Sequence, residues 1–237
     1  KVTTGMSHFL FRPFMTKYTR LDRKTRHAAD MYINVLEQLG VTDVANHGLH
    51  IETCKDWNDE VSRFYESQGV MPRDKIIGFN IGSAVPEKRW PAERFADVAD
   101  YFGNKGYKTV FFGGPMDLDM VKPVVAQMKT SPIVATGAFK LGPLAAAMKW
   151  CDLLITNDSG PMHVAISQGV PIVALYGPSN PFFYGPYQAK SIVLESMDHY
   201  EIGKSMKQVI KEGKYKGISV ITEEQVIKAA ETLLQES

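Results

Sequence analysis

Residues 151–181 read C-D-L-L-I-T-N-D-S-G-P-M-H-V-A-I-S-Q-G-V-P-I-V-A-L-Y-G-P-S-N-P, and this stretch decides the fold. Two short apolar runs, 153–155 and 172–175, flank a polar turn and a segment of small residues with helical spacing. The pattern predicts a strand, a tight turn, a helix and a second strand, which together form one βαβ unit. In an open parallel sheet, anionic ligands bind where such a helix begins, at the carboxyl end of the first strand.

The alternation of strands and helices continues on both sides of this unit. Apolar spacing predicts further strands at 76–81, 108–112, 132–135 and 191–194, and helices at 91–105, 117–129, 142–149, 204–211 and 222–234. Strands that alternate with helices of this length indicate an α/β domain whose parallel sheet is covered on both faces. Nearer the start we expect helices at 25–39 and 56–69, a short strand at 49–51, and loop over the first 25 residues.

Composition excludes some classes of function. The 237 residues carry a formal net charge of +1, which gives no electrostatic reason to expect nucleic acid as a partner. Cys54 and Cys151 are far apart and form no metal-binding pattern, so we interpret them as free thiols in a reducing compartment. No apolar run is long enough for a transmembrane helix, and no signal peptide is evident. Because the chain begins at Lys1 rather than methionine, we expect it to be a piece of a longer protein.

Four turns follow predicted strands and fall at the same edge of the sheet. The first, residues 80–91, places small residues such as Ser83 ahead of Lys88 and Arg89. A lysine there is a sensible phosphate partner, although a solvated surface loop explains the stretch equally well. The second turn ends at Asp117, where helix capping is a better explanation from spacing than contact with ribose hydroxyls. The third, residues 136–139, is best explained as a plain loop.

The fourth turn carries the densest set of polar residues: Asp158, Ser159, Gly160 and His163. Asp158 or Ser159 would cap the following helix, and His163 would be an interior histidine, if none of them had a further role. Neither explanation accounts for all four residues gathering at one helix start, so we favour a diphosphate site. Asp158 and His163 alone are too few for a metal site, and no P-loop or nucleophile triad is present.

These blocks resemble a known family. N-D-S-G-P-M-H-V-A at 157–165 and G-V-P-I-V-A-L-Y-G-P-S-N-P at 169–181 closely resemble the signature of glycosyltransferase family 9, the bacterial ADP-heptose:lipopolysaccharide heptosyltransferases. K-R-W-P at 88–91 looks like a second family motif. The resemblance runs from about residue 76 onward and is weaker before it. It implies a GT-B fold of two Rossmann-like domains, with 73–237 as the C-terminal nucleotide-sugar-binding domain and 1–72 as the remnant of the N-terminal acceptor domain and linker.

The resemblance also implies roles for the candidate residues. Donor phosphates would contact Ser83 and Lys88, ribose would contact Asp117, and the diphosphate and sugar would be lined by Asp158, Ser159, Gly160 and His163. Asp158 and His163 are the catalytic candidates, and neither a metal ion nor a cofactor is required. Nothing in the sequence matches the family's general base, so we name none and expect this chain alone not to transfer sugar.

The implied reaction is transfer of a heptose or related sugar from an ADP-sugar to a lipopolysaccharide core or other glycan acceptor. A nucleotide-sugar epimerase of similar build and a non-catalytic nucleotide-binding module are the alternatives. A cytoplasmic protein with peripheral contact at the inner face of the membrane is expected. We also expect residues 76–237 to fold alone, and Lys88 to be a surface lysine whose loss barely changes stability.

Overall fold

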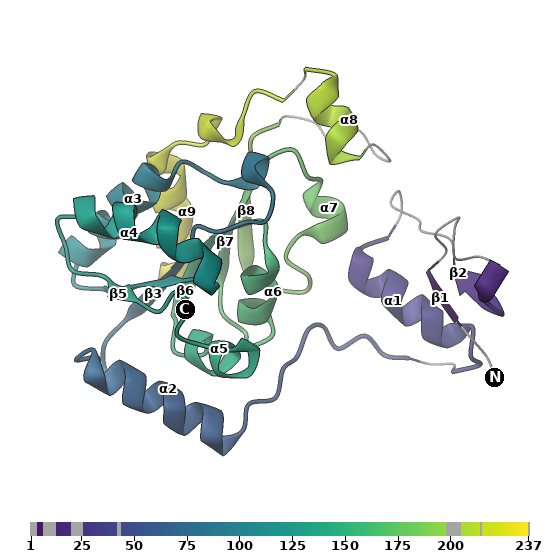
Figure 1. Ribbon diagram of the computed structural model, residues 1–237, viewed down its shortest axis with the longest axis horizontal. Helices are drawn as coiled ribbons and strands as arrows, with labels where there is room; N and C mark the ends of the chain where they lie inside the picture. The colour runs from purple at the N-terminus through teal and green to yellow at the C-terminus, as the bar shows by residue number, and fades with distance from the viewer. Residues whose placement is uncertain are drawn as a thin grey trace.

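The computed structural model describes residues 4–6, 13–19, 26–41, 44–197, 205–213 and 215–236. At its centre lies a six-stranded sheet with the order β5-β4-β3-β6-β7-β8 (Figure 1). Every neighbouring pair in this sheet is parallel. The strands are β3 (Ile76–Asn80), β4 (Lys108–Phe112), β5 (Ile133–Val134), β6 (Leu153–Asn157), β7 (Ile172–Tyr176) and β8 (Ser191–Glu195).

The strand order creates a switch point between β3 and β6. From β3 the chain proceeds outward to β4 and β5, and from β6 it proceeds in the other direction to β7 and β8. Loops that leave neighbouring strands in opposite directions open a crevice at the carboxyl ends of those strands. The predicted parallel, Rossmann-like α/β sheet is therefore confirmed, and its switch point falls at two of the predicted polar turns.

Helices cover both faces of the sheet. The first face packs against α2 (Lys55–Ser67), α5 (Leu141–Met148) and α6 (Gly160–Ile166), and the second against α3 (Ala92–Asn104), α4 (Leu118–Gln127) and α9 (Glu223–Gln235). Neighbouring side chains of β6 alternate between the two cores, with Leu154 in the first and Leu153 and Ile155 in the second. Because both faces are buried, these strands have continuous apolar sequences rather than alternating ones.

Close packing explains the glycine in the middle of β3. A Cβ atom on Gly78 would lie 2.9 Å from the side chains of both Leu154 and Phe112. Only a residue without a side chain fits there, so Gly78 lets the first core close over the central strands.

Several short elements were not expected from the sequence. They are α7 (Pro181–Tyr184) and the 3₁₀ turns η2 (Pro86–Lys88), η3 (Pro115–Asp117) and η4 (Ile218–Val220). Single turns are too short to produce a helical period, which is why spacing does not reveal them. The helix expected at 204–211 is α8 (Met206–Lys211), and residue 204 lies outside the described residues.

The beginning of the chain differs from the expectation in two places. Part of the expected loop forms a parallel pair, β1 (Thr4–Met6) with β2 (Lys17–Thr19), and the other residues before 26 lie outside the described ranges, apart from 13–16. The strand expected at 49–51 is absent. Leu49 and Ile51 pack their side chains against the first core, and the Ile51 carbonyl accepts a hydrogen bond of 2.7 Å from Gln168 Nε2. Their apolar character serves packing rather than strand pairing.

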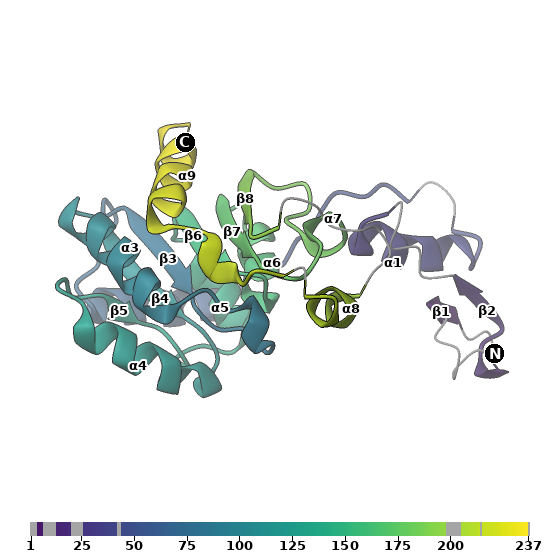
Figure 2. The same ribbon diagram turned by 90° about the horizontal axis from the view of Figure 1, so that it is seen from above.

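The N-terminal segment lies apart from the sheet. Both views show β1, β2 and α1 (Ala28–Glu37) beyond β8 and α7, joined to α2 by a long connection (Figures 1 and 2). One polar cluster, which we call the N-terminal contact, links the segment to the larger unit. His27 stacks on Tyr187 with ring centroids 4.6 Å apart, the Tyr187 hydroxyl donates to Asp30, and Asn46 Nδ2 donates to Asp30 Oδ1 at 2.9 Å.

Candidate functional site

A pocket of about 280 Å³ opens at the switch point, and we call it the switch-point pocket. The turn after β3, the turn after β6 and the short helix α7 supply its walls. Its lining residues are Ser83, Ala84, Val85, Lys88, Asp158, Ser159, Gly160, His163 and Tyr184. Six of the seven predicted site residues are therefore brought together, and the exception is Asp117.

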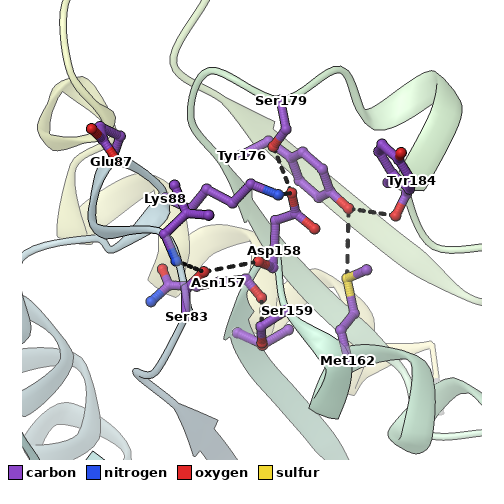
Figure 3. Close-up of polar contacts among 12 residues, drawn as sticks. Ser83, Glu87, Lys88, Asn157, Asp158, Ser159, Met162, Tyr176, Ser179 and Tyr184 are labelled. Atoms are coloured by element: carbon purple, nitrogen blue, oxygen red, sulfur yellow. Dashed lines mark hydrogen bonds and ion pairs between the residues drawn. The ribbon is translucent and has the colours of Figure 1, made fainter. Parts of the chain in front are cut away.

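An ion pair forms one wall of the pocket. Lys88 Nζ lies 2.5 Å from Asp158 Oδ2, and Ser179 Oγ donates to the same carboxylate oxygen at 2.5 Å (Figure 3). The side chains of Lys88 and Asp158 are only 17% and 6% exposed. The expectation that Lys88 is a surface lysine is therefore wrong, because its charge compensates a buried carboxylate. Removing one partner of such a pair leaves the other charge uncompensated.

Trp90 explains why the Lys88 turn has a fixed position. Its indole is buried and donates to the Ile221 carbonyl at 2.9 Å. Its backbone N–H donates to Asn157 Oδ1 at 3.0 Å, and Asn157 Nδ2 donates to the Ile81 carbonyl at 2.8 Å. One asparagine at the end of β6 thus holds both ends of the turn that follows β3. The K-R-W-P motif combines a cation with the anchor that positions it.

Ser83 and Arg89 are also fixed within this turn. Ser83 Oγ lies 3.4 Å from the Asp158 carbonyl, which joins the two turns directly. Arg89 Nε donates to the Ser83 carbonyl at 2.7 Å. Arg89 therefore stabilises the backbone of the turn, and Lys88 is the cation that reaches the pocket.

Helix capping does not account for the turn after β6. Ser159 occupies the N-cap position of α6, but its side chain makes no capping hydrogen bond. The Asp158 carboxylate is directed to Lys88 and Ser179 instead of the helix amides. The polar side chains of this turn therefore contact one another and line the pocket rather than cap α6.

His163 is half-buried in the pocket wall. Among the described residues, no side chain or backbone group makes a hydrogen bond to its ring. Burial lowers its pKa below the ordinary value of 6.5, the Asp158 carboxylate opposes that change, and the charges of His27 and Lys88 add to it. The ring is therefore neutral at pH 7, and its N–H is available to a ligand. A satisfied interior histidine is not what the structure shows.

Asp117 lies outside the pocket. Its carboxylate accepts a 2.8 Å hydrogen bond from the Gly114 N–H in the arrangement of a capping residue. It also lies directly against the first turn, because a Cβ atom on Gly82 would be 2.5 Å from Asp117 Oδ1. Contact with ribose remains a prediction. Phe139, in the third turn, packs edge-on against Phe64 with ring centroids 4.9 Å apart, which agrees with a plain loop.

Sequence reasoning missed three residues near the pocket. Ser179 holds Asp158, and Tyr184 forms part of the wall. The available signal was the G-P-S-N turn after β7, because that strand ends at the same edge of the sheet. His27, from the N-terminal segment, is near enough for its charge to affect the pKa of His163, and local spacing holds no signal for a contact so distant in sequence.

Comparison with known proteins places the chain in a family. The sequence profile of glycosyltransferase family 9 (heptosyltransferase) matches residues 4–216. Lipopolysaccharide heptosyltransferase 2 of Salmonella typhimurium is 32% identical over 166 residues, which are 68% of this chain and 47% of that protein. The corresponding Escherichia coli K12 protein is 33% identical over 164 residues, covering 67% of this chain and 47% of its own. The chain thus spans about half the length of these curated relatives.

Solved structures agree with the sequence match. A glycosyl transferase family 9 crystal structure from Veillonella parvula DSM 2008 is 80% identical with a TM-score of 0.92, and the match covers 100% of this chain and 68% of that one. E. coli ADP-heptose lps heptosyltransferase II, at 24% identity, has a TM-score of 0.80 over 99% of this chain and 70% of that one, which supports the GT-B-type fold. Because the profile match covers most of its length, the chain belongs to glycosyltransferase family 9.

Proposed function

We propose that the switch-point pocket binds the diphosphate of a nucleotide sugar. The protein then transfers a heptose or related sugar from an ADP-sugar to a lipopolysaccharide core or other glycan acceptor. The family supports this reading, since the curated relatives are named as lipopolysaccharide heptosyltransferases. In this scheme, the nucleotide-sugar-binding domain comprises the expected residues 73–237 together with α2, which packs on its sheet, and the residues before α2 belong to the acceptor domain and linker.

The ion pair between Lys88 and Asp158 carries the proposal. A lysine ammonium is a compact point charge suited to phosphate oxygens. Asp158, itself held by Ser179, keeps this ammonium at the pocket wall before any ligand arrives. An anion that enters the pocket meets a cation whose position is already fixed, so little side-chain entropy is lost on binding.

His163 and Ser159 complete the proposed donor site. When the glycosidic bond to the diphosphate breaks, negative charge develops on the departing phosphate oxygen. Lys88 stabilises that charge electrostatically, and His163, with no hydrogen-bond partner among the described residues, donates its ring N–H. Asp158 then acts through Lys88 rather than on the sugar. In this scheme no step requires a metal ion or cofactor.

The acceptor and the location in the cell follow from the proposed reaction. A lipopolysaccharide core is carried on lipid, so we propose a cytoplasmic protein in peripheral contact with the inner face of the membrane. Through the ranges that the structure describes, no helix has both the length and the apolar character needed to span a bilayer. Contact with the acceptor is assigned to the N-terminal domain, and we name no general base.

Calorimetry with ADP tests the donor site. The wild-type chain is expected to bind ADP more tightly than AMP, because Lys88 needs the second phosphate. Equal affinity for ADP and AMP, or no binding of either, would contradict the proposal. Product analysis with ADP-heptose, in a form as long as the curated relatives, checks the reaction. Sugar found on the acceptor indicates transfer, an altered free sugar nucleotide indicates epimerisation, and unchanged donor indicates binding alone.

A further inference from the structure

Asn80 is a buried polar residue directly beneath the switch-point pocket. It is the last residue of β3 and only 1% exposed. Its side-chain oxygen, Oδ1, is enclosed and has no hydrogen-bond partner among the described residues. An unpaired buried carbonyl oxygen lowers the stability of the fold, so such a residue needs an explanation.

The other end of the Asn80 amide is fully engaged. Nδ2 donates to Ser159 Oγ at 2.7 Å and to Thr156 Oγ1 at 3.0 Å. The Gly82 carbonyl lies 3.4 Å from the same nitrogen. A backbone carbonyl only accepts hydrogen bonds, so its presence selects the nitrogen rather than the oxygen at this position. The amide therefore acts as a donor to both hydroxyl groups.

The Ser159 hydroxyl donates its proton only weakly within the described part of the protein. Thr156 Oγ1 donates its proton to the Asn157 carbonyl at 2.7 Å. Ser159 Oγ donates to that same carbonyl at 3.3 Å, a long hydrogen bond that a closer anionic acceptor can replace. Because Asn80 occupies the acceptor side of the Ser159 oxygen, the remaining role of this hydroxyl is donation. Ser159 lines the pocket, so its proton can be given to a bound anion.

We propose that Asn80 is a positioning residue that holds the Ser159 hydroxyl as a hydrogen-bond donor to the diphosphate of the bound nucleotide. This inference rests on the proposed function of the switch-point pocket. Asn80 touches no substrate and acts through Ser159. Burying its unpaired oxygen lowers the stability of the fold. An apolar side chain at this position would avoid that loss but could not donate a hydrogen bond to Ser159.

A double-mutant cycle in ADP affinity tests the proposal on the full chain. Asn80→Ala and Ser159→Ala are each expected to weaken ADP binding by roughly tenfold to a hundredfold, the effect of one hydrogen bond to a charged group. The double variant should bind ADP as Ser159→Ala does, since Asn80 has no further effect once the hydroxyl is gone. If the two losses multiply, Asn80 does not act through Ser159 and the proposal is wrong.

Two further variants separate positioning from folding. Thr156→Val removes the other hydroxyl that receives the amide, and ADP affinity is expected to stay within about twofold. Asn80→Asp keeps the shape of the side chain but replaces the Nδ2 donor by a carboxylate oxygen. This oxygen accepts a hydrogen bond from the Ser159 hydroxyl and so competes with the bound diphosphate. The variant should weaken ADP binding more than Asn80→Ala does, at a melting temperature that shows a folded chain. An Asn80→Asp variant with wild-type affinity would overturn the proposal.

The same measurements distinguish this inference from the function on which it rests. If wild-type chain binds ADP and Lys88→Ala weakens that binding, the donor site stands, and multiplicative losses in the cycle reject Asn80 alone. If the wild-type chain does not bind ADP, both proposals fail together.

Discussion

The switch-point pocket and the N-terminal contact are built in opposite ways. The pocket is assembled from turns of one sheet, and buried anchors such as Trp90 and Asn157 fix those turns from beneath. The N-terminal contact is a partly buried polar cluster around Tyr187. The pocket's geometry therefore depends on the folded sheet, while the contact of the N-terminal segment with the larger unit includes a few hydrogen bonds and one ring stack.

Truncation gives the largest expected difference between the two regions. Residues 48–237, which lack the N-terminal segment but keep α2, should fold and bind ADP within about twofold of the full chain, because no pocket residue is lost. Residues 76–237 should be strongly destabilised. They lack Val61 and Tyr65, which are fully buried, and each such loss costs about 2–5 kcal/mol. Thermal melting and calorimetry on both fragments provide the test.

This revises the expectation that residues 76–237 fold alone. Helix α2 packs on α5, and the Tyr65 hydroxyl donates to the Ala147 carbonyl at 3.1 Å. These contacts favour a domain boundary before α2 rather than at residue 72. Wild-type stability of the 76–237 fragment would contradict this revision.

The Lys88–Asp158 pair gives the next largest effect. Lys88→Ala should weaken ADP binding by about 1.5–3 kcal/mol, the size of a charge-assisted hydrogen bond. It should also lower the free energy of unfolding by about 1–3 kcal/mol, because the buried Asp158 carboxylate keeps, among the described residues, only the Ser179 hydrogen bond. Calorimetry measures the first change and urea denaturation measures the second.

Lys55→Ala is the matched control. Lys55 pairs with Asp59 on the exposed surface of α2, so its loss should change stability by less than about 0.5 kcal/mol and leave ADP affinity unaltered. Equal changes in stability for Lys55→Ala and Lys88→Ala would show that burial of the Lys88 pair has no energetic consequence.

His163 should make ADP binding depend on pH. Its pKa is lowered in the free pocket, chiefly by burial, and a bound diphosphate raises it. Affinity should therefore rise as the pH falls below about 6.5, by roughly fivefold, because an imidazolium makes a stronger hydrogen bond than the neutral ring. The measurement is ADP affinity from pH 7.5 to 5.5 in wild type and in His163→Gln. ADP itself titrates in the same way in both experiments, so the difference between the two profiles reports on His163. Parallel profiles would exclude the role of His163.

The same lowered pKa fixes the sign of a stability effect. A histidine whose folded pKa lies below its unfolded pKa contributes stability that is complete above about pH 6.5 and is lost as the pH falls toward the folded value. Melting temperature should consequently fall less steeply with acidification in His163→Gln than in wild type.

Tyr187→Phe gives the smallest expected effect and tests the N-terminal contact rather than the switch-point pocket. It removes the hydroxyl that joins Asp30 to the loop after α7 and keeps the ring that stacks on His27. The same hydroxyl also accepts hydrogen bonds from Asn46 Nδ2 and Gln188 Nε2, and its loss should cost about 1 kcal/mol of stability and leave ADP affinity within about twofold. Melting and calorimetry check both values. A large loss of affinity would show that the N-terminal contact supports the pocket.

Sequence predicted the sheet well because buried parallel strands leave a strong local signal. The runs at 153–155 and 172–175 become β6 and β7, and the polar turn between them forms part of the pocket. The signal fails where structure depends on partners distant in the chain. The sequence around Lys88 does not predict that its charge pairs with Asp158, seventy residues away. It also does not predict that the Trp90 indole donates to the Ile221 carbonyl.

Side-chain direction, which spacing does not encode, determines what these single residues contact in the folded chain. Asp117 and Ser159 both occupy helix starts, and both are plausible caps from sequence. Asp117 makes no capping bond at the start of α4, but its carboxylate closes the preceding 3₁₀ turn through the Gly114 N–H, whereas Ser159 receives the Asn80 amide. Asn80 was visible in the sequence as the start of the first turn, but its role depends on the neighbouring strand β6.

The contact between Gly82 and Asp117 has an evolutionary consequence. A methyl group at position 82 would overlap the Asp117 carboxylate, and that carboxylate in turn caps its own turn through the Gly114 N–H. The two positions are therefore coupled. A side chain at 82 needs either a shift of the Asp117 carboxylate, which loses the Gly114 hydrogen bond, or a shorter residue at 117, which needs another way to close the turn after β4. Substitutions at positions 82 and 117 are expected to occur together in related sequences.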